Sequence, residues 1–205
     1  MRMPGRIAAI VMTALPGAAL AHHGMDGVAP ATIGQGIVSG FAHPVLGLDH
    51  LAFLLAAGLL AAATPRLGLR ALVNFLAAVI AGAVLHRAAI ELGPVEIGVA
   101  ISVIAAGLLL LAFGRRPAID GTLAINGFRL AGVFHGYAFA ESVAASPSDV
   151  FVAHLAALTL AQILIAGGAL LLARAVAGLG SLPFRAAGLG ATAIGAFALL
   201  AALQG

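Results

Sequence analysis

Residues 41–60 have the sequence FAHPVLGLDHLAFLLAAGLL, a run of small and apolar side chains that opens with His43, Asp49 and His50. The run is long enough for a membrane helix, because crossing a bilayer core about 30 Å thick takes about 20 residues. Ionisable side chains are costly at membrane depth, and those found there usually mark an ion or substrate pathway. The stretch therefore predicts a membrane helix whose first turns carry a functional site.

The composition extends this prediction to the whole chain. Of its 205 residues, 62% are hydrophobic and 8% are charged. Soluble domains average about 45–50% apolar and about 25% charged residues, so this chain cannot cover itself with a polar surface. Its continuous apolar runs of about 20 residues indicate helices, not the alternating strands of a barrel. We therefore expect an all-α, polytopic helix bundle in a lipid bilayer.

Several function classes are excluded by residue usage. The cationic residues are all arginines, scattered singly or in pairs with no interleaved aromatic residues, which is not a nucleic-acid-binding pattern. The chain has no cysteine, so it has neither disulfides nor thiolate metal ligands. It has no P-loop motif for ATP hydrolysis. A metal site in this chain must use His, Asp, Glu, amide or backbone donors.

Residues 1–21 have the pattern of a secretory signal peptide. Two arginines precede a short apolar core, and residues 19–21, Ala-Leu-Ala, fit the small-x-small rule for cleavage. The alternative is an uncleaved first helix. Cleavage would leave residues 22–35 as a periplasmic segment that begins with His22 and His23. A free amine beside two imidazoles can bind Ni or Cu, so this pair is a candidate capture site, unless the histidines occur in the tail by chance.

The remaining residues, 36–205, are predicted to form one transmembrane domain of six helices. The predicted spans are 36–63, 68–89, 95–113, 118–145, 149–176 and 184–203. Arginines lie in the loops after spans one, three and five, and the positive-inside rule puts these loops in the cytoplasm. Both mature termini are then periplasmic, in the inner membrane of a bacterium. Pro44 and Gly47 predict an irregular start to span one.

The first candidate site lies in the outer part of span one. In a continuous helix the seven-residue step from His43 to His50 returns to nearly the same face, with Asp49 about 100° away. Two imidazoles then converge on one ligand. If the backbone breaks at Pro44 and Gly47 instead, the three side chains can wrap around an ion. Both arrangements offer N and O donors suited to Ni, Co, Zn or Cu, and the alternative is structural polar packing.

A second candidate site lies in FHGYAFAES, residues 134–142. His135 and Glu141 are about 120° apart on a rigid helix, so Glu141 is either a neighbouring pathway carboxylate or a partner of a histidine on another span. His86 and His154 also fall in the outer half of their predicted spans, as ligands or as packing residues. We expect the side-chain amides within the spans to form interhelical hydrogen bonds; these are Asn74, Asn126 and Gln162.

These motifs resemble those of a known family. GFAHPVLGLDHLAFLLAAGL is similar to the first signature of the HupE/UreJ nickel permeases, of the form HPxxGxDH, and FHGYAFAES is similar to their second signature. The signal peptide, the histidine-bearing mature start and the six spans match as well. The resemblance implies His43, Asp49 and His50 as first-motif metal contacts, with His135 and Glu141 as second-motif residues. Many members carry a further histidine where this chain has Phe139.

The function that this resemblance implies is import of Ni²⁺ or Co²⁺ by a six-helix permease domain, serving hydrogenase, urease or cobalamin pathways. The ion would be cargo, and we expect no prosthetic group and no enzymatic activity. Two other readings remain open from the residues alone. One is an intramembrane zinc hydrolase, in which histidines and Asp49 activate a water. The other is haem or quinone binding between histidines of facing spans.

Overall fold

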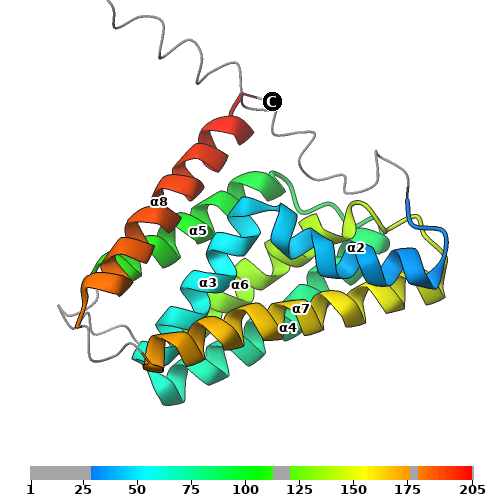
Figure 1. Ribbon diagram of the computed structural model, residues 1–205. Helices are drawn as coiled ribbons and strands as arrows, with labels where there is room; N and C mark the ends of the chain where they lie inside the picture. The colour runs from blue at the N-terminus through cyan, green and yellow to red at the C-terminus, as the bar shows by residue number, and fades with distance from the viewer. Residues whose placement is uncertain (1–28, 113–120, 176–179, 205) are drawn as a thin grey trace, which may run out of the picture.

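The computed structural model describes residues 29–112, 121–175 and 180–204. All regular secondary structure within these ranges is helical, as predicted, and Figure 1 shows its arrangement. The helices are α2 (Ile33–Leu46), α3 (Leu48–Ala63), α4 (Pro65–Arg87), α5 (Val95–Leu111), α6 (Gly121–Ala140), α7 (Ser148–Ala175) and α8 (Leu182–Ala202). The predicted signal peptide and the pair His22 and His23 lie outside the described residues.

Three helices of the described chain are long and apolar enough to cross a membrane: α4 from Leu67 to Arg87, α7 and α8. The helices α2 and α3 pass the same test together, as one span bent by 77°. α5 is apolar but has only 17 residues, and α6 carries Arg129 near its middle. The structure supports a multi-pass membrane helix bundle, and the number of six spans stays a prediction.

Large apolar side chains on the outer surface support the same conclusion. On α7, Leu164, Leu171 and Leu172 are each more than 60% exposed. Comparable leucines are exposed on α4, α6 and α8. Soluble monomers seldom expose large contiguous apolar patches, because water solvates them poorly. Lipid chains solvate such side chains well, so this surface suits a bilayer.

The first predicted span is broken into α2 and α3, as Pro44 and Gly47 predict. Pro44 lies inside α2 and has no N–H to donate to the carbonyl of Gly40. Gly47 then leaves the helix with extended backbone angles (φ −77°, ψ 101°). A Cβ at Gly47 would lie 2.7 Å from Cδ2 of His50, so the close approach of that ring requires glycine here. We call this break the elbow.

Helices α4 and α6 make the most extensive contact in the bundle. Gly132 packs against the backbone of Phe75, and Gly136 packs against the backbone of Val79. Because positions advance together along both helices, α4 and α6 run parallel. A Cβ at Gly136 would overlap the carbonyl oxygen of Val79, so the small residue is what permits this approach.

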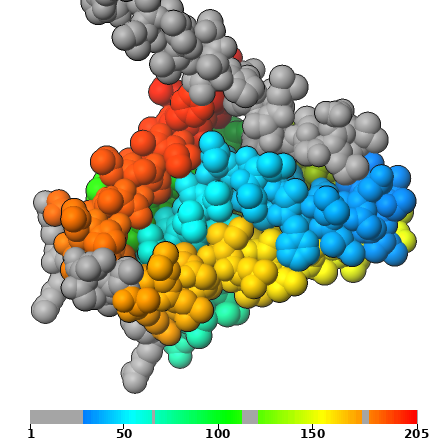
Figure 2. All heavy atoms as spheres, in the orientation of Figure 1, coloured from blue at the N-terminus to red at the C-terminus, as the bar shows by residue number. Residues whose placement is uncertain are grey.

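Helices α2 and α7 form a second parallel pair. Gly36 packs against Val150, and one turn later Gly40 packs against the carbonyl of His154. Figure 2 shows the face on which α2 and α3 lie directly against α7. Both parallel pairs agree with the alternating directions of the predicted spans. The small residues at these positions permit the close approach of the two helices.

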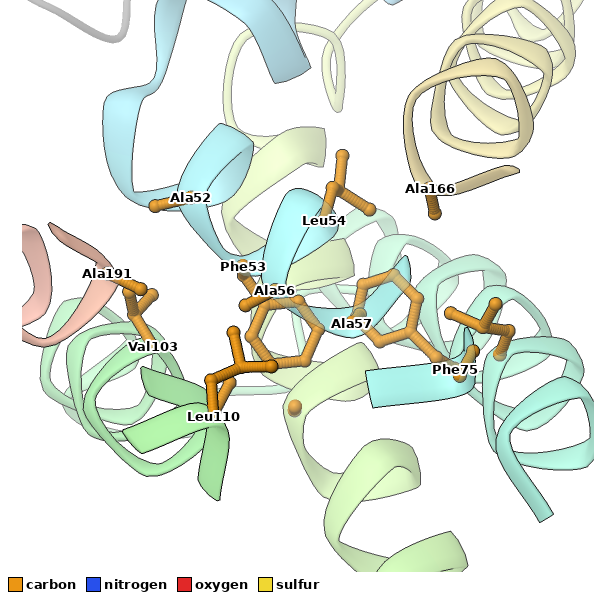
Figure 3. Packing of buried hydrophobic residues seen from close by; sticks show 14 of the residues in the cluster. Ala52, Phe53, Leu54, Ala56, Ala57, Phe75, Val103, Leu110, Ala166 and Ala191 are labelled. Atoms are coloured by element: carbon orange, nitrogen blue, oxygen red, sulfur yellow. The ribbon is translucent and has the colours of Figure 1, made fainter. Parts of the chain in front are cut away.

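Helix α3 lies at the centre of the bundle and contacts α2, α4, α5, α7 and α8. Figure 3 shows its buried side chains, with Phe53 near Phe75 of α4 and Leu54 directed toward Ala166 of α7. The rings of Phe53 and Phe75 are 5.0 Å apart between centroids. Because α3 is held on several sides, the residues at its first turn, including His50, have a fixed position.

Arg87 holds the end of α4 against the linker between α6 and α7. Its guanidinium donates hydrogen bonds to the carbonyls of Ala144 (3.1 Å) and Ser146 (3.0 Å) and to the hydroxyl of Ser148 (3.2 Å). It also lies 4.5 Å from the ring centroid of Phe151. These contacts give a structural reason for an arginine at a helix end that the charge pattern places outside.

Candidate functional site

Four histidines from four helices meet inside the bundle, and we call them the histidine cluster: His43 of α2, His50 of α3, His135 of α6 and His154 of α7. All four are buried. Ring centroids are 6.1 Å apart for His43 and His50, 6.3 Å for His43 and His154, and 4.8 Å for His50 and His135. Residues more than 100 positions apart in sequence are thus neighbours in the fold.

A hydrogen-bonded chain links three residues of the site. Nδ1 of His50 lies 2.8 Å from Nδ1 of His135, and Nε2 of His135 lies 2.8 Å from Oγ of Ser102 on α5. The hydroxyl of Ser102 in turn donates to the carbonyl of Val99 at 2.6 Å. A carbonyl can only accept, so the single hydroxyl proton is used there. Nε2–H of His135 must therefore donate to Ser102.

These hydrogen bonds also fix the tautomers of His50 and His135 when both rings are neutral. His135 carries its proton on Nε2, so its Nδ1 accepts from Nδ1–H of His50. His50 then has an unprotonated Nε2, which is the form of imidazole that binds a metal ion. Metal-binding histidines typically donate their other ring N–H to an acceptor that fixes the tautomer, and His135 has that position relative to His50.

Phe139 lies among the histidines, one helical turn after His135. Its ring centroid is 5.2 Å from that of His43, 4.2 Å from that of His50 and 6.3 Å from that of His135. The side chain is fully buried. The position at which this chain departs from the second family signature therefore lies inside the cluster, where it supplies apolar volume and no donor.

His154 completes the cluster from the second turn of α7. Its ring is fully buried, and neither nitrogen makes a hydrogen bond of normal geometry to another described residue. The backbone of Phe139 lies close enough to interact with it. Buried polar atoms usually have a partner in the protein, in ordered water or in a ligand. The ring nitrogens of His154 are therefore suited to bind a water molecule or a ligand.

The spacing of the rings suits ligand sharing, but the donor atoms do not yet converge. Two imidazoles on one ion have centroids about 5–6.5 Å apart, given metal–nitrogen distances of about 2.1 Å. The three measured separations are close to this range. Within the described ranges, no three His, Asp or Glu side chains form a ready metal site. Joint coordination would require the rings to rotate.

The structure does not bring the other described candidate residues into the histidine cluster. Asp49 is partly buried at the first turn of α3, where Oδ1 accepts from the backbone N–H of its neighbour His50 at 2.8 Å. Glu141 is exposed in the turn that follows α6. His86 stacks on Tyr137 with centroids 4.2 Å apart, near the end of α4. These three residues lie on three different segments: α3, the turn after α6, and α4.

Two features of the site escaped prediction from sequence. The only sequence signal for Ser102 is that it carries the single hydroxyl in the apolar run of residues 95–111. The hydrogen bond between His50 and His135 joins residues 85 positions apart, so no local pattern encodes it.

A bundle of apolar helices with a broken span and buried histidines at the break defines a polytopic membrane protein with an intramembrane polar site, as transporters have. A family model described as HupE / UreJ protein matches residues 10–198. The chain therefore belongs to the HupE/UreJ family, which is associated with nickel and cobalt transport. No curated protein and no solved structure matches the chain.

Proposed function

We propose that this protein is a permease that imports Ni²⁺, with Co²⁺ as the second candidate cargo, across the bacterial inner membrane. The observation that carries the proposal is the histidine cluster, in which four buried imidazoles from four helices meet beside a broken span. Its donors are nitrogens of intermediate softness, which suit Ni²⁺ and Co²⁺ better than Mg²⁺ or Ca²⁺. Membership of a family associated with nickel and cobalt transport supports the same cargo.

The cluster suits exchange better than permanent retention. Its rings are near the spacing for shared coordination, but their donor atoms do not converge. His135 is also held by hydrogen bonds to His50 and Ser102, which it would have to give up to bind an ion itself. A transporter needs a site that binds well enough to load the ion and weakly enough to release it. This balance favours a cargo site over a resident catalytic metal, and it supports transport without enzymatic activity.

The elbow gives the cluster a place on a transport path. Broken membrane helices place backbone carbonyls and helix ends beside transported ions in many carriers. Here the break at Gly47 lies between His43 and His50, so it positions two of the four rings. The first-motif carboxylate, Asp49, holds the first turn of α3 and so supports the position of His50.

The direct test is uptake of radioactive nickel by cells that express the wild type, His43→Ala or Asp49→Ala at matched membrane levels. We expect clear uptake by the wild type, the largest loss for His43→Ala, and a loss for Asp49→Ala as well. Uptake that is equal in all three, or absent in the wild type, contradicts the proposal. Competition with unlabelled Ni, Co, Zn and Cu then identifies the preferred cargo.

A retention assay separates a permease from a zinc hydrolase. The purified permease should lose nickel or zinc on washing with a chelator, whereas an enzyme with a resident ion should keep one equivalent. We further propose periplasmic termini, capture of metal by His22 and His23 of the mature end, and supply of a hydrogenase, urease or cobalamin pathway. Deletion of His22 and His23 should reduce uptake only at low external nickel concentration.

A further inference from the structure

Gln162 on α7 is fully buried, and neither its Oε1 nor its Nε2 has a hydrogen-bond partner among the described residues. The expectation that this amide forms an interhelical hydrogen bond is therefore wrong. Asn74 does what was expected, because its Oδ1 accepts from Nε of Arg129 across α4 and α6 at 2.7 Å. The two amides thus have different roles, and the state of Gln162 needs its own explanation.

The position of Gln162 relative to the histidine cluster is informative. It lies eight residues after His154, which is about 12 Å farther along the axis of α7. The charge pattern of the loops places this direction toward the cytoplasm. Gln162 also lies between Leu158, against which Gly40 of α2 packs, and Ala166, against which Gly58 of α3 packs. It therefore lies on the stretch of α7 between its contact with α2 and its contact with α3.

Few other polar side chains are buried in the described part of the chain. Besides the histidine cluster they are Ser146, in the linker before α7, and Gln162. Gln162 is thus the one buried polar side chain of the described ranges that lies beyond the cluster along α7. A buried amide with both ends unsatisfied is rare, and a water or an ion is one kind of partner that can satisfy it.

We propose that Gln162 is an inner binding position for the partly hydrated divalent cation after it leaves the histidine cluster. This inference rests on the proposed transport function. The amide oxygen is a neutral, hard donor that contacts the ion or one of its water ligands, while the amide N–H groups hold a further water. Because a neutral oxygen binds Ni²⁺ or Co²⁺ more weakly than imidazoles do, the ion can move on toward the cytoplasm.

The test compares Gln162→Leu with Thr159→Val in proteoliposomes loaded with a nickel-sensitive dye, together with nickel affinity measured by calorimetry in detergent. Thr159 is a matched control, because its hydroxyl is on the same helix but already donates to the carbonyl of Leu155 at 2.8 Å. We expect Gln162→Leu to lower the initial transport rate about tenfold or more, since hydrogen bonds to charged groups have effects of this size. Nickel affinity should change less than about threefold, because the histidine cluster is intact, and Thr159→Val should behave as the wild type.

Two further readouts decide the interpretation. Gln162→Glu should retain nickel longer than the wild type and release it more slowly, because a carboxylate binds the ion more tightly. The thermal midpoint of Gln162→Leu without metal should not fall, since the variant removes a buried unsatisfied group. A wild-type transport rate in Gln162→Leu overturns the inference, and so does a loss of rate accompanied by loss of nickel binding or of the folded state. Absence of transport by the wild type overturns the proposed function instead.

Discussion

Nδ1 of His50 and Nδ1 of His135 lie 2.8 Å apart and join α3 to α6 through two buried imidazole rings. This contact makes His135 a partner of His50 before any ion binds. A second hydrogen bond joins His135 to Ser102 on α5, so residues of three helices are linked by hydrogen bonds. Residues of the two sequence motifs are therefore in direct contact in the fold, and their energetic coupling is measurable.

Coupling between these two histidines is our first prediction. His50→Ala and His135→Ala should each lower nickel affinity about 10–100-fold, the range typical for loss of a ligand's supporting partner. The double variant should lose less than the sum of the two, with a coupling of about 0.5–3 kcal/mol, because the residues are in contact. Calorimetric titration of the four proteins of the cycle measures this. His86→Ala is the control: its ring stacks on Tyr137, and an equally large loss in it would contradict the assigned cluster.

The hydroxyl of Ser102 sets the tautomer of His135, and its removal gives the second prediction. Ser102→Ala leaves the buried Nε2–H of His135 without its acceptor, which should cost about 1–3 kcal/mol of stability. The thermal midpoint should fall, and nitrogen NMR of labelled histidine should show a mixture of tautomers. Ser146→Ala is the matched control, because the Ser146 hydroxyl is buried without a hydrogen bond to any described residue. Equal effects of the two variants would argue against the hydrogen bonds that link His50, His135 and Ser102.

The third prediction uses two substitutions of Phe139 to distinguish a packing role of this position from proximity to a bound ion. Phe139→His places a fifth imidazole among the other four and should tighten nickel binding while slowing release. Phe139→Leu keeps most of the apolar volume and adds no donor, so it should lose stability by about 1–2 kcal/mol and leave metal affinity nearly unchanged. Binding and retention assays on both variants measure the difference. If Phe139→His binds nickel no better than Phe139→Leu, the ring does not lie where an ion binds.

The elbow is the subject of the fourth prediction. Gly47→Ala places a methyl group 2.7 Å from Cδ2 of His50, so the ring must shift. We expect a loss of about 1–3 kcal/mol of stability, as for other overpacked sites, and reduced nickel uptake. Gly34→Ala, on the same helix as His43, meets no atom within 4 Å and should behave as the wild type. Thermal unfolding and uptake assays on the pair test this, and normal uptake in Gly47→Ala would show that the position of His50 is not critical.

The sequence alone determined the class of the protein and the position of its unusual residues. Helix formation and membrane insertion depend on local composition and on the length of apolar runs, so the all-helical bundle and the break near Pro44 and Gly47 could be predicted. The close helix approaches at Gly40 and Gly136 also follow from residue size. The two motifs by themselves indicate the HupE/UreJ family.

The tertiary structure decided which of these residues meet. Helical periodicity relates positions on one helix, but it does not specify which faces of different helices pack together. His43 and His50 come together through the 77° bend and not through a seven-residue repeat, and His154 joins them because α7 runs beside α2. Glu141 lies exposed beyond the end of α6, whereas the four histidines are buried. The contact of His135 with Ser102, and the unsatisfied amide of Gln162, depend on packing between distant segments, which the local sequence does not encode.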